Sequence, residues 1–165
     1  MTQLKHTISV LVNNQPGVLQ RVSGLFGRRG FNIESITVGE SEEPGLSRMV
    51  IVTTGDEKTV EQMYKQLYKL VDVIKVVNLS ENPMVGRELA LIKVASEPAQ
   101  RAEILSVVET FRAAVVDIGT NTLIVQVVGD STKIDAMVEL LRPYGIRELS
   151  RTGVTAMVRG ISGKA

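Results

Sequence analysis

Residues 13–35 read N-N-Q-P-G-V-L-Q-R-V-S-G-L-F-G-R-R-G-F-N-I-E-S. Pro16-Gly17 marks a turn, and the apolar residues after it recur at the three- and four-residue spacing of an amphipathic helix. Gly30 can adopt the left-handed conformation that ends many helices, and a β-rich segment resumes at Phe31. The turns carry no side chain suited to acid–base or nucleophilic chemistry, whereas asparagines flank the start of the helix. The segment therefore predicts a strand–helix–strand unit that can hold a small zwitterion such as an amino acid.

The same pattern continues over residues 5–79. Strands are predicted, in order, at residues 8–12, 31–38, 47–54 and 73–79. The apolar phase of the second strand slips between Ile33 and Ile36, which predicts a bulge near Glu34-Ser35. Asp56 is the expected N-cap of a second helix. The resulting order, β-α-β-β-α-β, is that of the ferredoxin-like pattern.

The order repeats in the second half of the chain. Residues 80–87 have the polar and chain-breaking composition of a linker. The expected elements then are a strand at 89–94, a helix from Glu97-Pro98, a hairpin of strands 114–118 and 122–128, and a helix capped by Asp130 and ended by Gly145. The last strand is either 146–149 or 154–158, and the pattern does not choose between them. Residues 160–165 are expected to form a frayed tail.

The predicted fold is α+β, with two tandem ferredoxin-like βαββαβ units, each an antiparallel sheet with two helices on one face. The first unit is expected at residues 1–79, the linker at 80–87 and the second unit at 88–165. A unit of this size has a marginal core, so an apolar sheet face left open is costly. Pairing with a second copy of the chain would cover such faces, and we expect a homo-oligomer.

Composition excludes several kinds of protein. The net charge of the 165-residue chain is +1, which gives no electrostatic reason to bind nucleic acid or an acidic membrane. Without cysteine, and with His6 as the single histidine, disulfides, thiolate catalysis and Cys- or His-rich metal sites are not expected. The chain start has no signal-peptide pattern and no apolar run is long enough to span a bilayer, so a cytoplasmic protein is expected.

The candidate site is the start of the first helix. The first N–H groups of a helix have no partner within it and carry the positive end of its dipole, so they can accept a carboxylate without a basic side chain. Gly17 allows close approach, and the amides of Asn14 and Asn32 can bind both ends of an amino acid. The alternative is purely structural, because Asn14 could simply cap the helix.

Taken together, several motifs resemble a known family. They are residues 13–36, L-S-R-M-V-I-V at 46–52, G-D-E at 55–57, Q-L-Y-K-L-V-D-V-I-K-V at 66–76, R-E-L-A-L-I-K-V at 87–94 and R-T-G-V at 151–154. The first resembles the ligand motif of ACT domains, and the full set resembles the small regulatory subunits of acetolactate synthase (acetohydroxyacid synthase). The resemblance covers nearly the whole chain. Pro16 departs from the family pattern, which often has another residue there, and a proline has no N–H to donate.

The resemblance implies a subunit that is not catalytic by itself. It implies a regulator that activates a large subunit, which condenses two pyruvates to acetolactate, and that confers feedback inhibition by valine or another branched-chain amino acid. Thiamine diphosphate, Mg and FAD are expected on the large subunit, and no cofactor or metal on this chain. Two ACT domains would pair as a homodimer. The effector would then be held by Asn14, Pro16, Gly17, Val18 and Leu19 of one protomer and by Asn32 and Ile33 of its partner.

Other classes of function stay open. An ACT-type sensor could serve a different amino-acid enzyme or a transcription factor, although no DNA-binding element is recognisable. An enzyme on a ferredoxin-like scaffold is not excluded by fold alone. An RNA-recognition module would need aromatic and basic residues on its sheet, and the chain has only three Phe and three Tyr.

Overall fold

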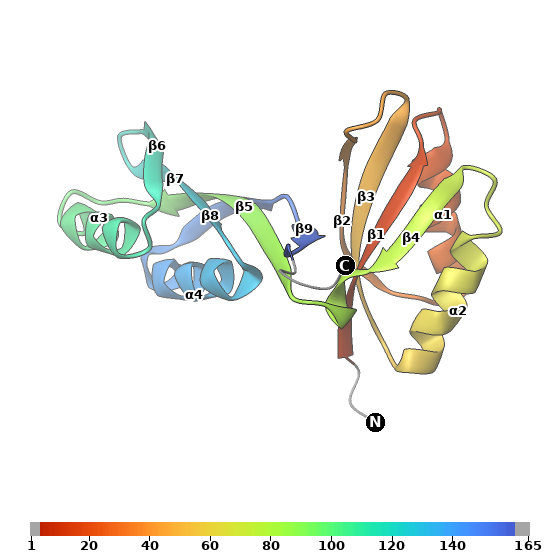
Figure 1. The fold of residues 1–165 in the computed structure, drawn as a ribbon. Coiled ribbons are helices and arrows are strands. Elements are labelled where there is room, and N and C mark those ends of the chain that lie inside the picture. The colour runs from red at the N-terminus through yellow and green to blue at the C-terminus, as the bar shows by residue number, and fades with distance from the viewer. Residues whose placement is uncertain (1–3, 161–165) are drawn as a thin grey trace. The chain divides into compact units, whose positions relative to one another are not determined.

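A computed structural model of the chain describes residues 4–160 and contains two units (Figure 1). Of these residues, the first unit combines 4–85 with 154–160, and the second comprises 86–153. In the described residues, no helix is long and apolar enough to cross a membrane.

The first unit is built around a four-stranded antiparallel sheet in the order β2-β3-β1-β4. Its elements are β1 (Leu4–Asn13), α1 (Val18–Arg28), β2 (Ile33–Glu40), β3 (Leu46–Gly55), α2 (Glu57–Leu67), β4 (Val73–Asn78) and the 3-10 turn η1 (Leu79–Glu81). This is the predicted ferredoxin-like topology. Strands β2, β3 and β4 lie within two residues of their expected bounds, whereas β1 begins at Leu4, four residues before its expected start.

Both helices of this unit pack on one face of the sheet. Phe26 of α1 and Met63 of α2 are fully buried in one cluster with the alternate strand residues Ile8, Val10 and Ile51. The apolar faces of the helices and of the strands therefore pack together in a single core. The predicted bulge is confirmed, because the pairing of β2 with β3 shifts register between Ile33 and Ser35.

The second unit repeats the topology. Its elements are β5 (Met84–Ala95), α3 (Arg101–Thr110), β6 (Ala114–Ile118), β7 (Thr122–Gly129), α4 (Ser131–Leu141), the 3-10 turn η2 (Arg142–Tyr144) and β8 (Ile146–Arg151), in the sheet order β6-β7-β5-β8. Ile104 of α3 and Met137 of α4 are buried against Ile92 and Val125 of the sheet. The predicted N-caps are both present: Thr59 N–H donates to Asp56 and Lys133 N–H donates to Asp130.

Both candidate last strands exist. Residues 146–151 form β8, which pairs with β5 and completes the second unit. Residues 155–158 form β9 (Thr155–Val158), which follows a left-handed turn at Gly153 and also pairs with β5. Ala156 of β9 is buried with Val50 and Leu79, so the C-terminal segment covers part of the sheet face that α1 and α2 leave open.

Three further boundaries differ from the sequence prediction. Residues 84–87, expected in the linker, already belong to β5 because its ladder extends past the apolar run. Helix α3 begins at Arg101 rather than at Glu97-Pro98, because a turn precedes it in which Glu97 O accepts the N–H groups of Gln100 and Arg101. The stretch from residue 154 onward, predicted in the second unit, belongs to the first, where Ala156 finds its apolar partners. The expected tail lies, beyond residue 160, outside the described residues.

Candidate functional site

The candidate site is the β1–α1 loop, residues 14–17, together with the first turn of α1. Backbone hydrogen bonds fix the entry of the loop, since Asn14 N–H donates to Gly45 O at 2.9 Å and Gln15 N–H to Asn13 O at 3.0 Å. The Asn14 side chain lies at an exposed position. The loop is thus a defined backbone path with its amide side chain accessible.

Gly17 is the N-cap of α1. Its φ is +84°, in the left-handed region, and no side chain makes a capping hydrogen bond to the helix. The alternative that Asn14 caps α1 is therefore wrong. Among residues 4–160, the N–H groups of Leu19 and Gln20 have no acceptor, and the first turn holds no acidic residue. This helix end keeps the uncompensated donors and the positive potential that favour an anion.

The other residues predicted to bind the effector from this loop differ in how deeply they are buried. Pro16 and Gly17 are exposed, and the Leu19 side chain is 47% exposed. Val18, by contrast, is 3% exposed and packs in the core of the unit. Its side chain therefore anchors α1 to the sheet, and its N–H is already bonded to Gln15 O at 3.3 Å.

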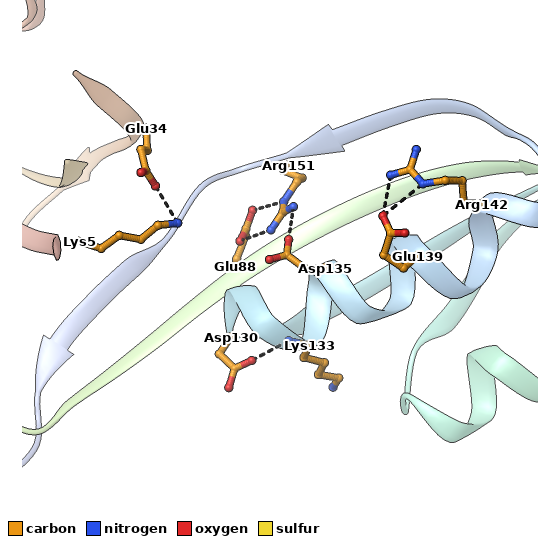
Figure 2. Close-up of polar contacts among 9 residues, drawn as sticks. All are labelled: Lys5, Glu34, Glu88, Asp130, Lys133, Asp135, Glu139, Arg142 and Arg151. Carbon is orange, nitrogen blue, oxygen red and sulfur yellow. Dashed lines mark hydrogen bonds and ion pairs between the residues drawn. The ribbon is translucent and has the colours of Figure 1, made fainter. Parts of the chain in front are cut away.

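Asn32 and Ile33 lie at the other end of α1, at the beginning of β2. Asn32 is exposed, and its carbonyl accepts the Thr53 hydroxyl, while Ile33 is half-buried against the core. Lys5 Nζ lies 2.8 Å from Glu34 Oε2 and ties this part of β2 to β1 (Figure 2). Because α1 has 11 residues, its ends are about 16 Å apart. One chain therefore does not bring Asn14 and Asn32 together.

Two residues at the loop were not identified from the sequence. Arg21, in the first turn of α1, donates through Nε to Asp72 Oδ2 at 2.8 Å, and its Nη2 lies 2.6 Å from the same oxygen. Asp72 is buried, and its carbonyl accepts the Asn13 N–H at 2.9 Å. The signal in the sequence was Arg21 itself, because a cation in the first turn opposes the helix dipole.

Elsewhere in residues 4–160, polar side chains join neighbouring strands of the sheets. His6 is buried, and its Nε2 donates to Gly55 O at 3.1 Å, which links β1 to the end of β3. In the second unit, Arg151 lies between Glu88 and Asp135 (Figure 2), and its hydrogen bonds to Glu88 raise the pKa of the guanidinium. Within residues 4–160, no group of three or more His, Cys, Asp or Glu is placed to hold a metal ion.

Two family models match the chain. One, described as "AHAS small subunit-like ACT domain", matches residues 8–75, and the other, described as "Small subunit of acetolactate synthase", matches residues 87–160. The two matches cover most of both units, and the candidate loop falls within the first.

Relatives match the chain over nearly its whole length. The "Probable acetolactate synthase small subunit" of Archaeoglobus fulgidus is 55% identical over 157 residues, which are 95% of this chain and 98% of the relative. The acetolactate synthase small subunit of Bacillus subtilis is 51% identical over 98% of this chain and 95% of its own length. The crystal structure of the acetolactate synthase small subunit from Thermotoga maritima superposes with a TM-score of 0.89 at 48% identity, covering 96% of this chain and 99% of that one. The fold class predicted from the sequence is thereby confirmed.

Proposed function

Because this chain belongs to the family of acetolactate synthase small subunits, we propose that it activates a catalytic large subunit and confers feedback inhibition by a branched-chain amino acid. Valine is the effector we expect. The chain contributes no catalytic group to the reaction. The thiamine diphosphate, Mg and FAD required to condense two pyruvates to acetolactate belong, in this proposal, to the large subunit.

The single observation that carries the effector site is the uncapped start of α1. The N–H groups of Leu19 and Gln20 meet no acceptor in the described chain, and Gly17 leaves the approach to them open. A carboxylate there would accept backbone hydrogen bonds at the positive end of the helix dipole. The exposed amide of Asn14 can accept a hydrogen bond from the effector's ammonium group.

The separation of the two half-sites supports pairing of two copies. Asn14 and Asn32 occupy opposite ends of α1, so an effector that contacts both takes one residue from each of two chains. A homodimer formed side by side through the ACT domains would meet this requirement, and Leu19, which is 47% exposed, would supply apolar contact to an aliphatic effector side chain.

Regulation then follows from linkage. An effector changes the activity of the large subunit only if it binds the inhibited arrangement more tightly than the active one. We infer that the amino acid, bound across two ACT domains, fixes their pairing and so changes how the small subunit contacts the large subunit.

Calorimetry of the purified chain against valine, leucine, isoleucine and an unrelated amino acid tests the proposal. Saturable binding of a branched-chain amino acid is expected, and Asn14→Ala and Asn32→Ala should each abolish or strongly weaken it. Titration is repeated with the large subunit present, so that a site completed only in the complex is also detected. Binding unchanged by both substitutions would reject the assigned residues, and no binding with or without the large subunit would reject the sensor function.

A further inference from the structure

Arg21 occupies a position that helix stability alone disfavours. The first turn of α1 contains no acidic residue, and a cation there lies at the positive end of the helix dipole. The guanidinium is held by two contacts to Asp72 Oδ2, at 2.8 Å from Nε and 2.6 Å from Nη2. Asp72 is far more buried than its partner, with a side chain 12% exposed against 48% for Arg21.

Asp72 holds the β1–α1 loop from both sides. Its side chain binds Arg21, four residues after the loop, and its backbone carbonyl accepts the N–H of Asn13, the residue before the loop. One residue next to the start of β4 thus fixes the distance between the two ends of a loop that is distant in sequence. Residues 14–17 between these anchors have few conformations left to lose when a ligand binds.

The guanidinium also borders the N-cap. Arg21 Nη1 lies 3.0 Å from the point where a Cβ on Gly17 would stand. The backbone hydrogen bond from Arg21 N–H to Gly17 O, at 3.0 Å, closes the first turn at the same place. The position of the arginine is therefore coupled to the conformation of the N-cap glycine, which presents the N–H groups that follow it.

From these contacts we infer that Arg21 and Asp72 are positioning residues for the effector loop: they pre-organise residues 14–17 and the free N–H groups of α1 for the effector carboxylate, without Asp72 touching the ligand. The ligand in this inference rests on the proposed function. The restricted conformation of residues 14–17 rests on the contacts of Arg21 and Asp72 alone. The inference goes beyond the predicted site, which contains neither residue.

Hydrogen–deuterium exchange and calorimetry together test it. Asp72→Asn keeps the size of the side chain but removes its charge, and Arg21→Gln removes the partner. Each is expected to raise amide exchange at residues 14–20 and to weaken effector binding about tenfold or more, as for loss of a charge-assisted hydrogen bond. The double variant should be no weaker than the worse single variant, since both changes break one interaction. Arg21→Lys restores a cation opposite Asp72 and should recover most of the affinity.

A matched control is Glu61→Gln, which breaks the exposed pair of Glu61 with Lys65 in the same unit. It should change neither exchange at residues 14–20 nor effector affinity. The half-inhibitory effector concentration of the complex should rise for Asp72→Asn while the inhibition reached at saturation stays the same, a split that general unfolding does not produce. If Asp72→Asn fails to fold, the same measurements on Arg21→Gln decide the question, because the Arg21 side chain is half-exposed.

The outcomes separate the inference from the proposed function. Unchanged exchange at residues 14–20 in Arg21→Gln or Asp72→Asn overturns the inference whether or not the effector is correct. A second result would also overturn it: Arg21→Lys loses as much effector affinity as Arg21→Gln, while Asp72→Asn keeps the parent affinity. That result would indicate that the arginine contacts the ligand directly. Absence of any branched-chain amino acid binding by the parent chain and its complex rejects the proposed function, while the exchange result still decides the loop assignment.

Discussion

Arg151 donates to both carboxylate oxygens of Glu88, from Nε to Oε1 at 2.6 Å and from Nη2 to Oε2 at 3.0 Å (Figure 2). Glu88 lies near the start of the second unit and Arg151 near its end, so the pair joins β5 to β8 across adjacent strands. The Glu88 side chain is 5% exposed, whereas Arg151 reaches solvent and also binds Asp135 at 2.7 Å. Removing one partner of a buried ion pair is strongly destabilising, because it leaves the other charge buried and unpaired.

We therefore expect Arg151→Met to destabilise the protein by about 3–5 kcal/mol, because it leaves Glu88 buried and unpaired. Arg142→Met is the control, since Arg142 pairs with the exposed Glu139 and its loss should cost about 0.5 kcal/mol or less. Urea unfolding followed by circular dichroism measures both. Equal destabilisation by the two variants would show that Glu88 does not depend on its arginine.

Comparing Gly17→Ala with Gly30→Ala separates the effect of backbone strain on stability from an effect on effector binding. Gly17 has a φ of +84° and Gly30 a φ of +69°, so alanine at either position should cost about 1–2 kcal/mol of stability. At Gly17 the added Cβ would stand 3.0 Å from Arg21 Nη1, whereas at Gly30 it meets nothing within 4 Å. Thermal unfolding should show similar losses for the two variants, while calorimetry should show weaker effector binding only for Gly17→Ala. Equal effector affinity in both would argue against a site at the N-cap.

The parts of the fold that were predicted depend on local patterns. Asp56 and Asp130 were recognisable as N-caps because each directly precedes a helical pattern. In the structure, each accepts a hydrogen bond from the N–H three residues later. The bulge after Ile33 was recognisable because it interrupts the two-residue alternation of one strand. The destination of β9 was not predictable in this way, because the burial of Ala156 depends on Val50 and Leu79, which are far away in sequence.

In the candidate site, too, residues with a local sequence signal were predictable and long-range contacts were not. Asn14, Gly17 and Asn32 were selected because turn and helix-start chemistry can be read from neighbouring residues. The Arg21–Asp72 pair joins residues 51 positions apart, so only the folded chain shows that Asp72 holds the loop. Val18, which the family resemblance placed among the effector-binding residues, has its side chain in the core.

Ala156→Asp tests whether the C-terminal strand stabilises the first unit. Ala156 is 6% exposed and packs with Val50 and Leu79, so a carboxylate there should destabilise the protein by about 2–4 kcal/mol. Met157→Asp is the control, because the neighbouring side chain is 69% exposed and its replacement should change stability by about 0.5 kcal/mol or less. Exchange protection of β1 and β3 should fall in the first variant alone. Retained protection of these strands in Ala156→Asp would mean that β9 is only loosely attached.

The Asp56 cap should make part of the stability depend on pH. Hydrogen bonds from the side chain and backbone N–H of Thr59 hold the pKa of Asp56 below its ordinary value. A carboxyl group whose pKa is lowered by folding stabilises the protein above its unfolded pKa, and this contribution disappears as the pH falls through the folded value. The difference in Tm between the parent and Asp56→Ala should therefore be largest near neutral pH and should narrow below about pH 4. Asp56→Asn, which keeps an acceptor but does not titrate, should show a Tm difference from Asp56→Ala that persists in acid.

Tyr64→Phe is expected to be neutral or stabilising, by up to about 1 kcal/mol. The Tyr64 hydroxyl is buried without a hydrogen-bond partner in the described chain, and burial, with a smaller effect from Glu81, raises its pKa. Removing an unpartnered polar group from a buried site recovers its desolvation penalty, and the phenyl ring keeps the contacts with the core. Tyr144→Phe is the comparison, because the Tyr144 hydroxyl donates to Glu103 Oε2 at 2.9 Å and its removal loses that bond without any such recovery. Chemical denaturation of both variants decides the point: a clear loss of stability in Tyr64→Phe would mean that the hydroxyl has a partner in solution, such as a bound water.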